Sequence, residues 1–191
     1  MTRGAARERA ILDATIDLLG EVGYANLTMD AVAARAHASK NTIYRRWPGK
    51  PELVGAALDA HDAAEVAAVP DTGTMRGDLL AALRAACARV DQRYAVMMTS
   101  LLHAMRVDPR LADVLRSHVA DDGLSPFPVI VGRAVARGEL GDGTAADLAH
   151  QAAEGLVLRR MLLDQPLDEE FLATVVDDLL IPLLTRHATG D

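Results

Sequence analysis

Cationic, amide and hydroxyl side chains are concentrated between residues 39 and 50 of the chain. Such groups are the donors with which proteins contact the phosphates and the base edges of DNA. Asparagine can pair with adenine and arginine with guanine, and each good bidentate pair contributes roughly 1–3 kcal/mol of discrimination between bases. The residues that carry these groups are Lys40, Asn41, Thr42, Arg45, Arg46 and Lys50.

Two short helices are predicted to position these side chains. The second runs from Ser39 to about Trp47, with Ser39 as its N-cap and Ile43 as an inward-facing anchor. The first runs from Thr28 to about Arg35, with Thr28 as its N-cap. Two short helices joined by a tight turn are the layout of a helix-turn-helix, whose second helix lies in the major groove of DNA. Amphipathic surface helices are common, however, so periodicity alone is weak evidence for this motif.

The rest of the chain is also predicted to be helical, because no stretch alternates apolar and polar residues long enough to form a strand. The N-terminal helix of the chain is predicted to cover residues 6–22, with Ile11, Leu18 and Val22 on its inner face, and Gly23 is predicted to end it. Further helices are predicted from Lys50 onward and at about 75–93, 96–106, 109–121, 127–137, 145–164 and 168–186.

The turn-forming run Val69–Gly73 divides the chain into two helical parts. The sequence therefore predicts an all-α fold, with an N-terminal domain over residues 6–68 and a larger C-terminal domain over residues 75–191. Pro182, late in the last helix, is expected to kink or weaken it. The N-caps predicted in the second part are Thr74, Asp108, Thr144 and Asp168.

The charge of the chain is divided between its two ends. The formal net charge is -7, yet the first 50 residues hold eight basic and five acidic side chains, a net charge of +3 that leaves -10 for the remainder. A basic head on an acidic body is expected where one end meets phosphates and the rest stays soluble. Without a DNA-binding motif, uneven but solvated charge would be an equally good interpretation. Aromatic residues make up only 3% of the chain, so the core is predicted to be mainly aliphatic.

The single cysteine, Cys87, excludes an intrachain disulfide and is typical of a reducing compartment. It lies on an apolar helical stripe, which favours a packed, inert thiol over a redox sensor. The N-terminus is charged and carries no apolar signal segment. Since no apolar run reaches the length of a membrane span either, we expect a cytoplasmic protein with no membrane partner.

The segment from about Arg9 to Leu58 resembles the DNA-binding domain of the TetR/AcrR family of transcriptional regulators. The matching motifs are I-L-D-A, G-Y-A-N-L-T-M, V-A-A-R-A and S-K-N-T-I-Y-R-R-W-P-G-K-P-E-L. The last motif is the most specific, because it combines a cap, a helix, an aromatic pair and a lysine at fixed spacing. The resemblance implies an N-terminal three-helix helix-turn-helix domain that binds double-stranded DNA.

The resemblance also assigns roles to individual residues. Thr28, Tyr44 and Lys50 match positions that contact phosphates, whereas Trp47 is expected to seal the small core. In the turn, the family usually has glycine where this chain has His37, which we interpret as a tolerated left-handed residue. Arg9 and Arg35 are also expected to contact the DNA backbone. Contacts to bases or to their flanking phosphates are expected from Lys40, Asn41, Thr42, Arg45 and Arg46.

Scattered pieces of the second half resemble one of the C-terminal domain types of the same family. They are L-L-H-A-M-R-V-D-P-R-L, R-A-V-A-R-G-E-L and P-L-D-E-E-F. The resemblance implies that residues 75–191 bind an effector and form a homodimer through the last two long helices. A monomeric core is the alternative for these helices. The interface residues predicted on them are Leu148, Ala152, Leu156, Val175, Leu179 and Leu183.

A stripe of methionine and leucine near residue 100 is a candidate lining for an effector pocket. Flexible thioethers suit an adaptable lipophilic cavity. A stripe at this spacing is more often part of an ordinary core. The predicted pocket residues are Met97, Met98, Leu101, Leu102, His103 and Met105, with Arg106 as a further polar contact.

These features together predict a ligand-responsive, sequence-specific transcriptional regulator, most simply a homodimeric repressor that a small lipophilic effector releases from a palindromic operator. An enzyme is disfavoured, because we find no paired metal ligands, nucleophile motif, phosphate loop or acid–base constellation. No catalytic residue, metal or cofactor is therefore predicted. Non-specific DNA packaging is a further alternative, against which the acidic second half argues.

Overall fold

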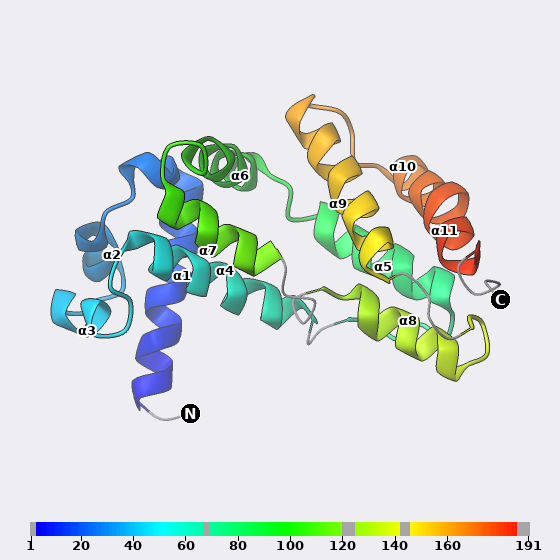
Figure 1. The fold of residues 1–191 in the computed structure, drawn as a ribbon, viewed down its shortest axis with the longest axis horizontal. Coiled ribbons are helices and arrows are strands. Elements are labelled where there is room, and N and C mark those ends of the chain that lie inside the picture. Colours follow the sequence, from blue (N-terminus) through cyan, green and yellow to red (C-terminus); the bar gives the residue numbers. More distant parts are fainter. Residues whose placement is uncertain (1–2, 67–68, 120–124, 142–145, 187–191) are drawn as a thin grey trace. The chain divides into compact units, whose positions relative to one another are not determined.

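The computed structural model describes residues 3–66, 69–119, 125–141 and 146–186, and within these ranges the chain is helical with no strand (Figure 1). The predicted all-α fold is thus confirmed. The elements are α1 (Arg3–Asn26), α2 (Met29–Arg35), α3 (Lys40–Tyr44), α4 (Lys50–Val66), α5 (Met75–Cys87), α6 (Gln92–Ala104), α7 (Pro109–Val119), α8 (Phe127–Ala136), α9 (Ala146–Leu162), α10 (Glu169–Thr174), the π-helical stretch η2 (Val175–Leu180) and α11 (Ile181–Arg186).

These helices form two compact units that are not divided at a single point of the chain. The first unit contains α1 to α4 together with α6 and α7, and the second contains α5 and α8 to α11. The contacts therefore group α6 and α7 with the N-terminal helices, although they follow the turn at residues 69–73. The functional division into residues 6–68 and 75–191 stays a prediction.

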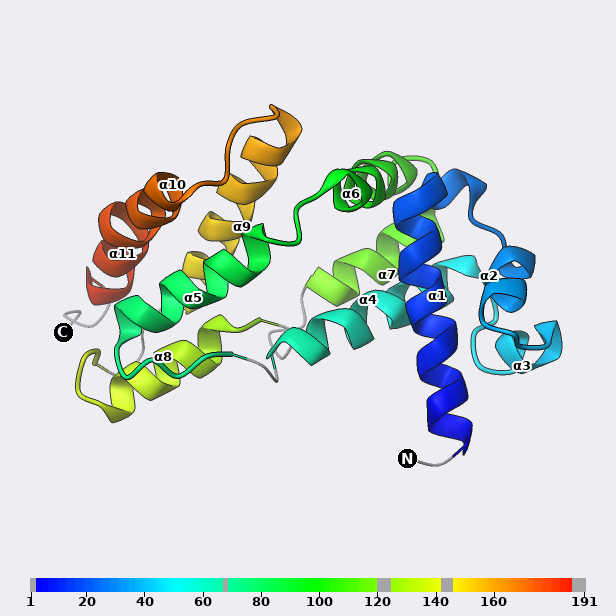
Figure 2. The ribbon, with the colours of Figure 1, turned by 180° about the vertical axis from the view of Figure 1, so that it is seen from behind.

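The core of the first unit includes the contact between α6 and the C-terminal part of α1 (Figure 2). Ile11, Leu19, Ile43 and Leu53 are among its fully buried side chains. The prediction that Val22 faces inward was wrong, since 42% of it is exposed.

The packing face of α1 explains this exposure of Val22. A methyl group on Gly20 would lie 3.1 Å from Cβ of Arg93, and one on Gly23 would lie 3.0 Å from Cβ of Ser100. The helix α6 thus covers the glycine side of α1. Val22 follows Gly20 by two residues, about 200° around the helix, and points away from α6.

The predicted helix 75–93 is interrupted in the structure. The helix α5 ends at Cys87, and α6 begins at Gln92 behind the N-cap Asp91, whose Oδ1 accepts a hydrogen bond of 2.8 Å from the Tyr94 amide. The apolar spacing continues across this break, so periodicity alone did not reveal it. A capping aspartate four residues after Cys87 was the available signal.

The second unit has its own aliphatic core between α5, α8, α9 and the C-terminal helical rod. Its fully buried side chains include Leu79, Ile130, Leu180 and Leu184. The predicted caps Thr74 and Asp168 are confirmed, because their side chains accept the amides of Gly77 and Phe171 at 3.1 and 3.0 Å. The predicted cap Thr144 lies outside the described residues.

The rod from α10 to α11 is irregular just before Pro182, as the sequence suggests. Proline has no amide hydrogen to donate to the preceding turn and crowds its carbonyls. The wider π-helical turn η2, Val175–Leu180, lies immediately before this position. Helical backbone continues through it into α11.

Candidate nucleic-acid interface

The helix-turn-helix is built from local hydrogen bonds that the sequence predicts. Oγ1 of Thr28 accepts the amide of Ala31 at 3.1 Å, and Oγ of Ser39 accepts the amide of Thr42 at 3.2 Å. Each hydroxyl therefore satisfies a free amide at the start of its helix, α2 or α3. The helix α3 is shorter than predicted, since it ends at Tyr44 instead of reaching Trp47.

The turn between these helices places His37 in the left-handed region, with φ of 48°. This is the conformation that glycine adopts most readily and that a side chain makes costly. The turn closes with a 2.9 Å hydrogen bond from the Ala38 amide to the Ala33 carbonyl. In addition, Nη1 of Arg7 donates to the His37 carbonyl oxygen at 2.8 Å, which ties the turn to α1.

The two sides of α3 differ in the way that a reading helix requires. Ile43 is fully buried and Trp47 is 7% exposed, so both belong to the core, as predicted. The exposed side carries Lys40, Asn41 and Tyr44, with the exposed Arg45 and Arg46 directly after the helix, and Thr42 is half-buried. A helix with this arrangement can enter a major groove while its other side stays packed.

Most of the predicted cationic DNA contacts are paired with carboxylates on the same unit. Nζ of Lys40 lies 2.6 Å from Oδ2 of Asp30, and Arg46 pairs with Glu8. Such exposed pairs contribute only about 0–1 kcal/mol, so phosphates can replace the carboxylates. Arg35 and Arg9 are paired in the same way, at 2.7 Å with Glu21 and 2.8 Å with Asp13. Within the described residues Arg45 forms no ion pair.

Lys50 is held differently, at the start of α4. Its Nζ donates a 2.8 Å hydrogen bond to the carbonyl oxygen of Tyr24 and lies 4.1 Å from the centre of the Tyr24 ring. The pKa of the Lys50 ammonium lies below its usual value, because burial lowers it more than the nearby carboxylate of Asp108 raises it. An ammonium has three hydrogens, and one of them is used on Tyr24. The side chain is therefore oriented before any DNA arrives.

The structure does not bring the six predicted pocket residues to one cavity. Met97 and Leu101 are buried in the core of the first unit, and Met98 and Met105 pack at the margin of that core. The side chains of Leu102 and His103 are exposed instead. The reason is that α6 turns its methionine and leucine face toward α1, so burial favours the core interpretation of this stripe.

The predicted interface residues also divide between surface and core. Leu148 on α9 is 47% exposed, and Ala152 and Leu156 are half-buried. On the C-terminal rod, Leu179 and Leu183 are half-buried, but Val175 is 3% exposed and belongs to the core of the second unit.

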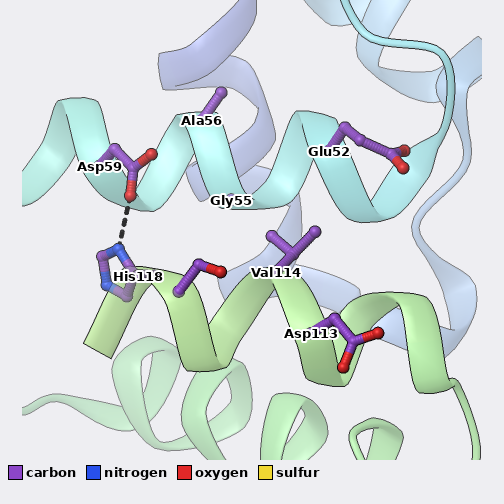
Figure 3. Close-up of a pocket in the computed structure, with 8 residues that line it drawn as sticks. Glu52, Gly55, Ala56, Asp59, Asp113, Val114 and His118 are labelled. Atoms are coloured by element: carbon purple, nitrogen blue, oxygen red, sulfur yellow. Dashed lines mark hydrogen bonds and ion pairs between the residues drawn. The ribbon is translucent and has the colours of Figure 1, made fainter. Parts of the chain in front are cut away.

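A shallow groove between α4 and α7 was not predicted from the sequence (Figure 3). Nδ1 of His118 lies 2.6 Å from Oδ1 of Asp59, and its Nε2 lies 3.2 Å from Oδ2 of Asp62. The pKa of His118 is raised to about 9, and the hydrogen bond to Asp62 is the largest cause of this rise. The charged ring therefore holds α7 to α4. No local signal links residues this far apart, so sequence analysis missed this cluster.

The capped pair α2 and α3, with a cationic exposed side on the second helix, defines a helix-turn-helix DNA-binding protein. Residues 11–57 match the family model "Bacterial regulatory proteins, tetR family", and residues 69–179 match "Tetracyclin repressor-like, C-terminal domain". The chain belongs to the TetR family of transcriptional regulators.

Individual relatives agree with this assignment. The DNA-binding transcriptional repressor TetR of Mycobacteroides abscessus is 44% identical over 98% of this chain and 99% of its own length. An uncharacterised HTH-type regulator of Mycobacterium tuberculosis, Rv1556, is 39% identical over 96% of this chain and 90% of its own. The solved TetR-family regulator SCO0332 is 30% identical, covers 94% of this chain and 97% of its own, and superposes with a TM-score of 0.72.

The protein is accordingly a DNA-binding transcriptional repressor of the TetR family and not an enzyme. Among the described residues, no helix combines the length and the apolar character that a membrane crossing requires.

Proposed function

We propose that this chain acts as a homodimer that binds a palindromic operator through α3 and leaves it when a small apolar effector binds. The observation that carries the proposal is the exposed side of α3. The neutral Asn41 is exposed there, as is Arg45, which forms no ion pair within the described residues. Their amide and guanidinium groups suit adenine and guanine.

Operator recognition follows from the two kinds of contact at this surface. Lys50, Tyr44 and Thr28 provide groups for the phosphates, which fix the position of the protein on the duplex. The side chains on α3 then reach base edges. Two copies of α3 must lie about 34–36 Å apart, or a multiple of that distance, to enter successive major grooves of a palindrome.

The homodimer is supported by the outer face of α9. Leu148 and Leu162 on α9, and Leu163 directly after it, are 47–54% exposed, an unusual concentration of exposed leucines. Gly155 on the same helix has open space where a side chain would be, which suits close approach of a second helix. Leu148→Glu is therefore expected to shift the protein to monomers, and sedimentation velocity measures this.

A matched control for the dimer test is Leu102→Glu. Leu102 is also exposed, at 40%, but lies on α6. This variant is expected to remain dimeric. If both variants keep the sedimentation coefficient of the native protein, the assignment of α9 to the interface fails.

The effector is proposed to be apolar or amphipathic, because most of the side chains in the core of the second unit are apolar. FadR of Bacillus subtilis, whose fold is similar with a TM-score of 0.59 at 18% identity, was solved in complex with stearoyl-CoA. A panel of fatty acids, acyl-CoAs and polar anions can be screened for release of operator DNA. Release by small polar anions alone would contradict the proposal.

DNA binding itself is tested by selecting a preferred duplex from a random pool and measuring its affinity by fluorescence anisotropy. A sequence-specific regulator should prefer this duplex over random DNA by roughly 10³-fold or more. The selected sequence should have twofold symmetry. Equal affinity for both duplexes would favour non-specific packaging. Asn41→Ala should relax the choice of bases, whereas Thr72→Ala, in the second unit, should leave it unchanged.

A further inference from the structure

Tyr24 joins the end of α1 to three other helices of the first unit. Gly23, with φ of 70°, breaks the helical geometry just before it and directs the following residue inward. Only 5% of Tyr24 is exposed. Its amide donates a 3.0 Å hydrogen bond to Oγ of Ser100 on α6, and its hydroxyl donates a 2.9 Å hydrogen bond to Oδ2 of Asp108.

Asp108 is the residue that joins α6 to α7, and it is fixed from both sides. Its amide donates to the carbonyl oxygen of Ala104 at the end of α6, at 2.8 Å. Its Oδ1 accepts the amide of Leu111 in the first turn of α7, at 3.1 Å. The carboxylate that receives the Tyr24 hydroxyl therefore moves only if this junction moves.

The other side of Tyr24 holds Lys50. The carbonyl oxygen of Tyr24 accepts from Nζ of Lys50 at 2.8 Å, and the same ammonium lies over the ring at 4.1 Å. A lysine side chain has four flexible carbons and loses up to about 2 kcal/mol of rotamer entropy when it is fixed. Here the free protein has already fixed the side chain, so this entropy is not lost when a phosphate is bound.

We propose that Tyr24, held in place by Asp108, is a positioning residue for the phosphate contact of Lys50. The junction of α6 and α7 thereby acts on DNA affinity through one side chain at the start of α4. This inference rests on the proposed operator contact of Lys50, and it adds residues that do not themselves touch DNA.

A double-mutant cycle tests the proposal on the full-length protein. Tyr24→Phe removes only the hydroxyl that Asp108 accepts, and Lys50→Met removes the ammonium but keeps the length of the side chain. The operator affinity of both single variants, of the double variant and of the native protein is measured by anisotropy at several salt concentrations. Tyr94→Phe on α6 removes a phenol hydroxyl from the same unit and serves as the control.

Lys50→Met is expected to weaken binding and to reduce the slope of log affinity against log salt by about one phosphate contact. Tyr24→Phe should weaken binding by about 3–10-fold when Lys50 is present, at most the stabilisation that one intramolecular hydrogen bond contributes. It should cause no further loss in the Lys50→Met background. Tyr94→Phe should bind like the native protein.

A second pair of variants keeps the test decisive if Tyr24→Phe unfolds. Asp108→Ala should show at least the loss of Tyr24→Phe, because it also removes the acceptor of the Leu111 amide. Asp108→Asn can keep both contacts, with Oδ1 accepting the Leu111 amide and Nδ2 donating to the Tyr24 hydroxyl oxygen, and should restore affinity to within about twofold. Equal losses in the presence and absence of Lys50, or no loss at all, would overturn the inference. If instead Lys50→Met leaves both affinity and salt slope unchanged, the proposed phosphate contact itself is wrong.

Discussion

Replacement of His118 by glutamine is expected to remove a pH-dependent contribution to stability. The ring lies between Asp59 and Asp62, and only 14% of its side chain is exposed. These carboxylates raise the pKa of His118 from its ordinary 6.5 to about 9. Such a rise corresponds to about 3 kcal/mol in favour of the folded, charged state, because each tenfold change is about 1.4 kcal/mol.

The measurable effect is smaller than this value, since both carboxylates are partly exposed to solvent. Asp59 is 54% exposed and Asp62 34% exposed. We therefore expect His118→Gln to lower the free energy of unfolding by about 1–2 kcal/mol at pH 6. The folded pKa is raised above the unfolded one, so this stabilisation is complete below about pH 6.5 and is lost as the pH rises through 9.

Urea unfolding of the native protein and the variant between pH 6 and pH 9.5 measures this dependence. Taking the difference between the two proteins removes the contribution of groups that titrate alike in both. His103→Gln is the matched control, because His103 is exposed on α6. A difference that stays constant across this range, or that grows with pH, would refute the charged arrangement of His118.

Three further predictions follow from particular backbone and core positions. His37→Gly should raise the free energy of unfolding by about 1 kcal/mol in thermal denaturation and leave operator choice unchanged, because φ of 48° suits glycine. Gly55→Ala should destabilise by about 1–3 kcal/mol, since the added methyl group would overlap Cγ1 of Val114, and Val114→Ala should largely restore stability in urea unfolding. Burial raises the pKa of Asp78, but hydrogen bonds from Thr72 and Arg137 outweigh this effect and hold that pKa below its usual value. Asp78→Ala should therefore lower the free energy of unfolding by about 2–4 kcal/mol at neutral pH. In urea unfolding, this difference should shrink as acid protonates the carboxylate of the native protein.

The DNA-binding motif was predictable because its determinants are local. The caps Thr28 and Ser39 and the turn residue His37 act on amides or torsions within three residues, and the structure has each in the predicted role. Trp47 and Ile43 were also placed correctly, since the polar residues around them left only one side to bury.

The features that the sequence did not predict depend on which surface each helix packs against, and local sequence does not specify this surface. Met97 and Leu101 form a clear apolar stripe, but only the structure shows that α1 covers it. Val175 was assigned to an interface for the same reason, although it packs inside its own unit. His118 and Asp59 are separated by 59 positions, and neither residue type at its own place signals the other.

The paired cations on the DNA-binding surface affect how this repressor responds to ionic strength. DNA releases condensed cations when protein charges neutralise its phosphates, and this release gives binding its dependence on salt. Lys40 and Arg46 already hold the carboxylates of Asp30 and Glu8. When a phosphate displaces such a carboxylate, the freed acid attracts a cation from solution, which offsets the one that DNA loses. We therefore expect fewer ions to be exchanged than the surface has basic side chains, so the proposed operator binding should keep more of its strength in concentrated salt than a count of lysines and arginines implies.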